Sequence, residues 1–441
     1  MSRPRLPHLP ALVALAWAAS GCAPPSDAAP SGSRRPRVAR PEGCRAVAAG
    51  TPLQPLVDAA AAGQALCLAP GRHAGPVVVR AAVTLWGPPE AVIVAAAGHT
   101  AVTLGAPGAR LLGLTVDGVG GGSGPLEVAV RGVADHVVIE GVTVLGAAHG
   151  IVVERARGVR VVGNHVRGTT EAAVGQRGDT IRLWETDDAV VEGNLVEDGR
   201  DLVVWYSRGA AVRGNRVLRA RYGTHFMYSH DTEVTGNEYV DITVGIFVMY
   251  SKRVVIAGNV IANAAGAAGI AIGLKDSGTV RIADNTLVGD ELGIYLDATP
   301  QQRDETVAIT GNRLHLCRTA LAFHAATHGV TVRGNDFGGN DAQVRVDGGG
   351  DALLVTWDGN WFDDYAGYDL DHDGIGDVPY QLRSFSGELV GRRPDLAFFS
   401  GTPALALADA AAHLDPLFQP KTLLEDPRPR MSPVASSTGA P

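Results

Sequence analysis

The sequence predicts an all-β fold, a right-handed parallel β-helix in which the chain winds through stacked strands. The first observation is a Gly-Asn or Asp-Asn dipeptide that recurs at intervals between 21 residues (Asn194 to Asn215) and 30 residues (Asn164 to Asn194). A repeat of this length is typical of a solenoid, in which each unit buries its apolar side only against its neighbours. The repeating asparagines are Asn164, Asn194, Asn215, Asn237, Asn259, Asn285, Asn312, Asn335 and Asn360.

The second observation is the alternation of apolar and variable residues around these asparagines. Val191 and Ile256 stand three positions before an asparagine, and Val196 and Tyr239 stand two positions after one. Alternation with a period of two, once per repeat, indicates strands. Asparagine suits the bend between strands because it tolerates left-handed backbone geometry, and stacked amides can hydrogen-bond from coil to coil.

A second strand precedes each of these strands, with inward pairs such as Ile246 and Val248. The residues between the inward pairs then face outward in columns. One column is Glu154, Trp184, Trp205, Met227, Met249, Lys275, Asp297 and His324. The neighbouring column is Val152, Arg182, Val203, His225, Phe247, Gly273, Tyr295 and Ala322. A register shift of one residue would exchange the inward and outward faces, so every argument about these columns depends on the register.

The composition and the N-terminus indicate an exported protein. The net charge of −8 argues against a nucleic-acid partner, which favours a basic surface. Residues 1–22 have the features of a signal peptide, with Arg3 and Arg5 before an apolar stretch too short to span a bilayer. The segment from Ala19 to Cys22 resembles a lipoprotein processing site, which makes Cys22 a lipidation candidate. Ordinary signal cleavage nearby is the alternative.

The rest of the chain divides into three predicted regions. Residues 23–43 form a flexible tether rich in Pro, Ser, Ala and Arg. Residues 44–400 form the β-helix, and a short helix within Gln54–Gly63 caps its first coil. Residues 401–441 form a tail that docks a partner, with His413–Pro427 as the candidate transporter contact, and its end is disordered. Cys44 and Cys67 can pair in an oxidising compartment, which leaves Cys317 single and packed.

The outward columns hold a candidate metal site. Met227 and Met249 lie 22 residues apart, in Met-Tyr-Ser segments, and His225 lies on the same face. Adjacent rungs are about 4.8 Å apart, so two thioethers and an imidazole can share one ion. Soft donors of this kind select Cu(I). Trp205 and Phe247 border the site and limit the access of water. Ordinary packing of a methionine pair is the alternative.

A second candidate metal site is acidic. Asp369, Asp371, Asp373 and Asp377 alternate with other residues around a glycine bend, which matches the first half of a calcium loop. The twelfth position of an EF-hand loop would be Glu, whereas this chain has Tyr380, and Asp363 or Asp364 is the candidate for the missing ligand. We expect a structural Ca²⁺ there, and a solvated acidic turn is the alternative.

At these residues the sequence resembles the NosD family of periplasmic copper-maturation factors for nitrous oxide reductase. The resemblance covers roughly residues 50 to 420 and rests on four segments. They are Arg221–Ser229, Val244–Ser251, Gly273–Asp276 and the block from Gly359-Asn360-Trp361 to Pro379-Tyr380. The resemblance implies a β-helix in the periplasm, docked on an ABC-type transporter made of an ATPase and a membrane subunit. It also implies Cu(I) received from a small lipoprotein chaperone and delivered to the reductase of denitrification, with Met227, Met249 and His225 as ligands. A lipid anchor at Cys22 would depart from the family's pattern.

Three functions compete. The first is a copper-binding scaffold that is not an enzyme. The second is a polysaccharide lyase, epimerase or hydrolase, which would use a groove of carboxylates and a base. The outer columns and their neighbours offer Glu154, Glu185, Lys275, Asp276, Asp297 and His324 for such chemistry. The third is a structural docking module, whose anchors would be Trp184, Trp205, Phe247 and Tyr295.

Overall fold

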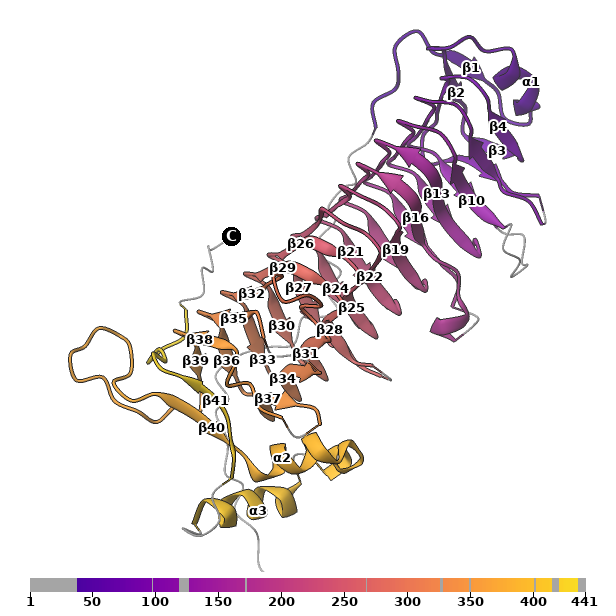
Figure 1. Cartoon of the computed structure of the whole chain (residues 1–441). Coiled ribbons are helices and arrows are strands. Elements are labelled where there is room, and N and C mark those ends of the chain that lie inside the picture. The colour runs from indigo at the N-terminus through magenta and orange to yellow at the C-terminus, as the bar shows by residue number, and fades with distance from the viewer. Residues whose placement is uncertain are drawn as a thin grey trace, which may run out of the picture. The chain divides into compact units, whose positions relative to one another are not determined.

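The fold is a parallel β-helix built from three sheets, as a computed structural model of the chain shows (Figure 1). The structure describes residues 38–434 except 97, 119–126, 171–172, 267, 326–327, 349, 400–401 and 415–419. The signal peptide with Cys22, most of the tether and residues 435–441 lie outside the described residues. The predicted fold class is confirmed, and the helix expected near the first coil is α1 (Leu53–Asp58), which packs against β4 (Val77–Val79).

Each coil contributes one short strand to each sheet. The 14-stranded sheet contains β1 (Arg45–Val47), β2 (Ala65–Leu68), β5 (Thr84–Trp86), β8 (Arg110–Leu112), β11 (Val138–Glu140), β14 (Arg160–Val162), β17 (Val190–Glu192), β20 (Ala211–Arg213), β23 (Thr232–Thr235), β26 (Lys252–Ala257), β29 (Gly278–Ala283), β32 (Val307–Thr310), β35 (Val330–Arg333) and β38 (Thr356–Asp358). The 12-stranded sheet contains β4, β7 (Val102–Leu104), β10 (Val128–Gly132), β13 (His149–Arg157), β16 (Ile181–Asp187), β19 (Asp201–Trp205), β22 (Tyr222–Met227), β25 (Val244–Met249), β28 (Ile270–Lys275), β31 (Leu292–Asp297), β34 (Thr319–His324) and β37 (Ala342–Val346). The 13-stranded sheet contains β3 (Gly71–Ala74), β6 (Ala91–Val94), β9 (Thr115–Asp117), β12 (Thr143–Leu145), β15 (His165–Arg167), β18 (Leu195–Glu197), β21 (Arg216–Leu218), β24 (Glu238–Val240), β27 (Val260–Ala262), β30 (Thr286–Val288), β33 (Arg313–His315), β36 (Asp336–Gly338) and β39 (Trp361–Phe362).

The recurring asparagines form one continuous hydrogen-bonded ladder inside a corner of the solenoid. Asn215 is representative: its backbone N–H and its Nδ2 both donate to Oδ1 of Asn237, at 2.8 and 2.9 Å. The same Nδ2 donates to the carbonyl of Val191 in an earlier coil. The ladder asparagines are at most 2% exposed, and each amide meets its partners with no need for water. This arrangement confirms the stacking of amides that the sequence predicts.

The ladder ends on a carboxylate. Asp426, in β41 (Thr422–Asp426), is fully buried and accepts from the backbone N–H and the Nδ2 of Asn360, at 3.0 and 2.8 Å. β41 pairs antiparallel with β40 (Tyr380–Arg383) and so returns the chain to the last coil. Arg430 adds bonds to the carbonyls of Gly359 and Asn335 and to Asp336. The C-terminal segment therefore closes the open end of the solenoid.

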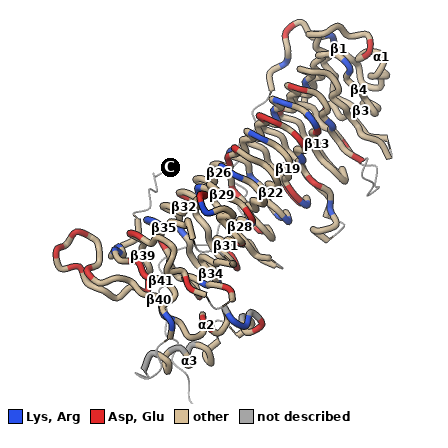
Figure 2. Tube along the Cα trace, viewed as in Figure 1, with Lys and Arg blue, Asp and Glu red and all other residues tan. Residues whose placement is uncertain are grey.

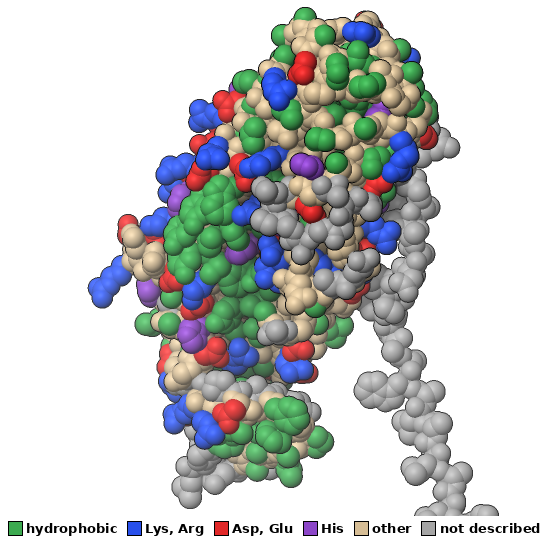
Figure 3. Space-filling model, turned by 90° about the vertical axis from the view of Figure 1, so that its right-hand side faces the viewer, with side chains coloured by type: hydrophobic (Ala, Val, Ile, Leu, Met, Phe, Trp, Pro, Cys, Tyr) green, Lys and Arg blue, Asp and Glu red, His purple; other side chains and the backbone are tan. Residues whose placement is uncertain are grey.

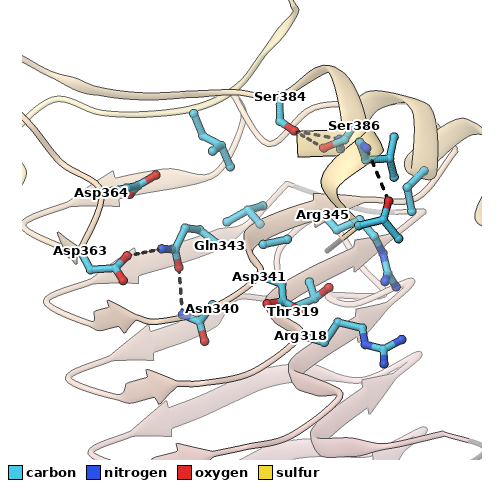
Figure 4. Close-up of a pocket in the computed structure, with 17 residues that line it drawn as sticks. Arg318, Thr319, Asn340, Asp341, Gln343, Arg345, Asp363, Asp364, Ser384 and Ser386 are labelled. Atoms are coloured by element: carbon cyan, nitrogen blue, oxygen red, sulfur yellow. Dashed lines mark hydrogen bonds between the residues drawn. The ribbon is translucent and has the colours of Figure 1, made fainter. Parts of the chain in front are cut away.

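Helices complete this C-terminal cap. α2 (Phe385–Arg392), η2 (Pro394–Phe399) and α3 (Pro403–Leu414) follow β40, and α2 packs against β37. A cavity of about 410 Å³ lies between the last coils and α2 (Figure 4). In it Gln343 donates to Asp363 and accepts from Asn340, so the polar groups on this wall satisfy one another. The remaining short helix, η1 (Val174–Gln176), lies in a loop before β16.

Charged residues lie along the edges of the coils, with both signs mixed (Figure 2). Arg219 is typical because it pairs with Asp198 at 2.7 Å and with Glu197 at 3.1 Å, both in the preceding coil. The hydrogen bond from Arg219 lowers the pKa of Asp198. At the other end of the solenoid a disulfide joins Cys44 to Cys67 and so ties the chain before β1 to β2. Cys317 is a free, buried thiol.

One buried carboxyl group, that of Asp290, destabilises the folded state at neutral pH. Asp290 is 2% exposed, and burial raises its pKa to about 8. Its Oδ1 accepts from the N–H of Ala264 at 2.7 Å, and its Oδ2 has no hydrogen-bond partner among the described residues. At the equivalent corner, Asn340 Oδ1 accepts from the N–H of Cys317 at 2.9 Å. An amide therefore fits where the carboxyl group of Asp290 stands.

We expect Asp426→Ala to destabilise the C-terminal coils by about 2–4 kcal/mol. The change leaves the buried donors of Gly359 and Asn360 without an acceptor, and each unsatisfied donor costs about 1–3 kcal/mol. Denaturation monitored by circular dichroism, together with hydrogen exchange of the coils around Asn335 and Asn360, measures the effect. Glu425→Ala removes a neighbouring exposed carboxylate and is the control, expected to change stability by less than about 0.5 kcal/mol. Equal behaviour of the two variants would contradict the capping role.

We expect Asp290→Asn to stabilise the protein at pH 8 and to lose this advantage towards pH 4. The folded pKa of about 8 lies above the ordinary 3.8, so the folded state holds a proton that the unfolded state releases. The unfolding free energy of the parent protein therefore falls as the pH rises from 3.8 to 8, on the order of a few kcal/mol. Thermal melts across this range measure the difference. Asp284→Asn, at a carboxylate 71% exposed, is the control. A stability difference that does not change with pH would refute the expectation.

Candidate functional site

The strand pairing places both predicted outward columns in register. Met227, the last residue of β22, pairs with Met249, the last residue of β25. Trp205 precedes Met227 in the same column, and Lys275 follows Met249. The inward neighbours of the methionines, Phe226 and Val248, are fully buried, whereas both methionines are half-buried on the outer face. The register on which the sequence argument depends is therefore the one observed.

His225 brings a third donor to the methionine pair. Its Nε2 lies 3.4 Å from the Sδ of Met249. With bonds of about 2.0 Å to nitrogen and 2.3 Å to sulfur, two ligands of one tetrahedral ion lie about 3.5 Å apart. The residue is 8% exposed, and burial lowers the pKa of the imidazole to about 4. The ring is neutral at pH 7 and therefore has a lone pair available for a metal.

Aromatic rings enclose the imidazole. Tyr222 stacks on His225 with ring centres 4.6 Å apart, and Trp205 stands edge to face with it at 5.4 Å and 89°. Phe247, in the next coil, is 6.4 Å from it. The Nδ1 of His225 is buried and has no hydrogen-bond partner among the described residues. The histidine is thus held by rings and not by a hydrogen-bonding carboxylate.

An ion pair fixes the tyrosine that stacks on His225. Arg221 donates two hydrogen bonds to Asp201, which is 1% exposed. The N–H of Tyr222 donates to the same carboxylate at 3.2 Å, and the Arg221 guanidinium lies 5.0 Å from the centre of the Tyr222 ring. The sequence pattern did not point to Tyr222, because this residue lies two positions before the inward pair, outside both columns, where the register between β19 and β22 shifts.

The tyrosines of the two Met-Tyr-Ser segments occupy a left-handed corner. Tyr228 and Tyr250 both have φ of +51°, and Tyr206, one coil earlier, has φ of +53°. Left-handed geometry is unfavourable for such a side chain and is tolerated where neighbours compensate it. The three rings compensate by stacking, with centres 5.4 and 4.8 Å apart and planes within 15° of parallel. The sequence signal for this corner was the Tyr-Ser pair that repeats with the methionines.

The serines of the same segments form a second buried ladder. The N–H of Ser229 donates to the Oγ of Ser251 at 2.9 Å, and the N–H of Ser251 donates to the Oγ of Ser277 at 3.2 Å. Each hydroxyl also donates to the carbonyl of its own methionine, at 3.3 Å for Met227 and 2.7 Å for Met249. Each triplet thus supplies an outward thioether, a stacked ring and an inward bond that fixes the corner.

Around the methionines the outer face is apolar. Figure 3 shows a hydrophobic patch on this side of the molecule, bordered by charged side chains. Trp184 and Trp205 contact each other with ring centres 5.5 Å apart, and Tyr206 lies 5.1 Å from Trp184. Tyr295 belongs to the column of Phe247 but lies two coils further on, beyond Gly273, and is half-buried. Of the four expected anchors, Trp205 and Phe247 therefore adjoin the methionine site, Trp184 lies one coil before Trp205, and Tyr295 stands apart.

Two of the four carboxylates that an enzyme would use are engaged in close ion pairs, whereas Glu185 is exposed and Asp276 lies 3.9 Å from Lys275. Glu154 pairs with Arg131 at 2.5 Å, and Asp297 pairs with Lys275 at 2.5 Å. The pairing with Asp297 raises the pKa of Lys275. These pairs stand at the two ends of the outward column, with the aromatic and thioether side chains between them. The column holds no cluster of free carboxylates in the part of the chain that the structure describes.

The acidic loop brings three of its four carboxylates together. Ligand atoms of Asp369, Asp371 and Asp373 lie within 4.8 Å of one another. Asp377 is outside this group and accepts from the N–H of Leu370 at 2.7 Å. Asp363, a further candidate ligand, accepts instead from Gly339 and Gln343.

Comparison with known proteins finds similarity to one family. A family model described as periplasmic copper-binding protein (NosD) matches residues 162–367, which include both methionines and His225. A Pseudomonas aeruginosa protein named probable ABC transporter binding protein NosD is 28% identical over 389 residues, 77% of this chain and 82% of the relative. The chain is thus similar to the NosD family, over residues that include the methionine site. A Stutzerimonas stutzeri protein of the same name is 29% identical over 94 residues, 21% of this chain and 22% of that NosD.

Solved structures similar to this chain share its fold. The A-module of the Azotobacter vinelandii mannuronan C-5 epimerase AlgE6 has a TM-score of 0.52 and 15% identity, covering 66% of this chain and 89% of the module. The catalytic unit of a GH87 α-1,3-glucanase from Streptomyces thermodiastaticus has a TM-score of 0.53 and 15% identity, covering 74% and 71%. At this identity the likeness shows the β-helix alone. Among the described residues, none of the helices combines the length and apolarity that a membrane span requires.

Proposed function

We propose that this NosD-like protein accepts Cu(I) in the periplasm through Met227, Met249 and His225 and helps deliver it to nitrous oxide reductase. The observation that carries the proposal is the register of the two thioethers, with an imidazole nitrogen 3.4 Å from one of them. Two thioethers and one neutral imidazole form a soft donor set, which favours Cu(I) over zinc or calcium. The description of the family as copper-binding supports this assignment.

Transfer proceeds by ligand exchange, with no covalent bond of the protein broken. A donor from a partner replaces one thioether at a time, which is possible because both methionines are half-exposed. A copper chaperone lipoprotein supplies the ion, and the reductase receives it. The ATPase and membrane subunits of an ABC transporter assist, in keeping with the name of the Pseudomonas aeruginosa relative. Part of the predicted transporter contact, His413–Pro427, is engaged in the protein's own C-terminal cap, because Leu424 and Asp426 of β41 are buried there, and residues 415–419 lie outside the described residues, so the exposed residues of this segment are the candidate contact.

The aromatic surface beside the site is where partners approach. Trp205 and Phe247 adjoin the methionines, Trp184 lies one coil before Trp205, and Tyr295 extends the same face two coils beyond Phe247. Large rings that are half-buried on a flat sheet lose little conformational entropy on binding and are typical anchors of protein interfaces. A partner seated there is within reach of the bound ion. We infer a binding protein and not an enzyme, because the carboxylates of the outward column are held in ion pairs.

We expect the double variant Met227→Leu, Met249→Leu to lose Cu(I) binding while the fold is unchanged. Leucine keeps the volume of the side chain and removes the sulfur donor. Anaerobic titration with Cu(I) against a chromophoric chelator measures stoichiometry and affinity, and the affinity should fall by at least about 100-fold. Met431→Leu is the matched control, because Met431 is a thioether outside the outward columns, 38% exposed. Unchanged Cu(I) stoichiometry in the double variant would rule out the site.

A second metal site is proposed at the acidic loop. Asp369, Asp371 and Asp373 supply hard oxygen ligands, and Gly374, with φ of +85°, makes the tight bend that follows them. A Ca²⁺ held there neutralises three neighbouring carboxylates and stiffens the loop that leads into β40. Its role is structural and independent of copper.

We expect Ca²⁺ to raise the melting temperature and to bind with a Kd on the order of 10⁻⁴–10⁻³ M, as in extracellular modules. Isothermal titration and thermal melts with and without EDTA measure both effects. Asp371→Asn with Asp373→Asn should abolish them, whereas Asp304→Asn, at an exposed carboxylate outside the loop, should leave them intact. A melting temperature that does not respond to Ca²⁺ in the parent protein would refute this site.

A further inference from the structure

Trp205 stands where a bound ion would meet an aromatic ring. It occupies the same outward column as the methionines, one coil before Met227. Its ring centre lies 5.4 Å from that of His225, with the two planes at 89°. Its Nε1 is buried and has no hydrogen-bond partner among the described residues. A buried tryptophan is most stable when its indole N–H donates a hydrogen bond. Packing alone therefore does not explain the position of Trp205.

The Trp205 ring is also positioned for a cation–π contact. The Arg182 guanidinium lies 5.8 Å from the centre of the Trp205 ring and 5.1 Å from that of Trp184. These distances are within the range of cation–π contacts, and tryptophan is the strongest acceptor of the aromatic residues. Both tryptophans therefore lie in a part of the sheet where ring faces meet cations, but only Trp205 adjoins the donor set.

The two ends of the methionine pair differ. Beyond Met249 the next residue of the column is Lys275, whose ammonium is held by Asp297. Beyond Met227 the next residue is Trp205. A lone cation such as Cu(I) is repelled by the first neighbour and attracted by the ring of the second. The charge of Lys275 is offset by Asp297, and the Arg182 guanidinium stands 5.8 Å from the Trp205 ring, so Trp205 is distinguished from Lys275 as the uncharged neighbour of the donor set.

We propose that Trp205 is a specificity-determining residue, whose indole face covers the Cu(I) held by Met227, Met249 and His225. This inference rests on the proposed copper site. The ring adds attraction to a monovalent ion and supplies no lone pair. Met227, Met249 and His225 supply three donors and the indole adds none, whereas the tetragonal coordination of Cu(II) requires a fourth ligand. The site accordingly favours the reduced ion and shields it from water.

Three variants of the full chain test this role. Trp205→Leu removes the ring, Trp205→Phe keeps a weaker ring, and Trp184→Leu removes the neighbouring tryptophan of the same column. Anaerobic Cu(I) titration should show one ion per chain in all three. Affinity should fall about 5- to 30-fold in Trp205→Leu, fall less in Trp205→Phe and stay within about twofold in Trp184→Leu. Circular dichroism and thermal melts establish that each variant is folded.

Quenching of tryptophan fluorescence by Cu(I) is a measurement that a purely structural role of Trp205 would not affect. Cu(I) should quench the emission of the parent protein, and the Trp205→Phe variant should lose most of this quenching while Trp184→Phe retains it. Equal Cu(I) affinity of Trp205→Leu and Trp184→Leu, with quenching retained in Trp205→Phe, would overturn the role of Trp205 and leave the copper site standing. Cu(I) binding that survives the double methionine variant would instead overturn the copper site, and the role of Trp205 with it.

Discussion

Hydrogen bonding between stacked corner side chains is the constraint on which the rest of the structure depends. Each ladder asparagine binds the backbone of an earlier coil and the amide of the next, so a coil cannot slip by one residue without breaking buried hydrogen bonds. The ladder ends on Asp426, which the C-terminal strand β41 brings back to the last coil. The corner asparagines and the C-terminal strand β41 therefore fix the same register of the coils.

That register determines what the outer face can do. Residues that are 22 apart in sequence become neighbours, so two methionines can supply one site although neither is near the other along the chain. The Met-Tyr-Ser triplet serves this purpose in three ways. The serine fixes the corner from inside, the tyrosine stabilises a left-handed turn by stacking, and the methionine is left free on the outer face. A binding site is thus built from the same corners that hold the coils together.

The surroundings of the site suit a soft, weakly hydrated ion. Rings of Tyr222, Trp205 and Phe247 enclose His225 and keep it neutral, because burial disfavours the imidazolium. Charged side chains of the same column are paired and lie beyond the aromatic part, as Lys275 with Asp297 and Glu154 with Arg131. The site combines uncharged donors with low water access, which disfavours the hard, strongly hydrated ions that the acidic loop attracts.

The sequence by itself determined the coil period, the inward and outward faces and the residues of both columns. The alternation of apolar residues and the recurring asparagines are local patterns that can be recognised along the sequence. Met227, Met249 and His225 could therefore be placed on one face from the sequence. Only the tertiary structure decided how these side chains meet. The stacking of Tyr222 on His225, the left-handed tyrosine corner, the unpartnered Nε1 of Trp205 and the Asp426 cap all depend on packing between coils. A sequence pattern specifies which face a residue occupies, whereas the direction of its ring or donor atom depends on neighbours one coil away.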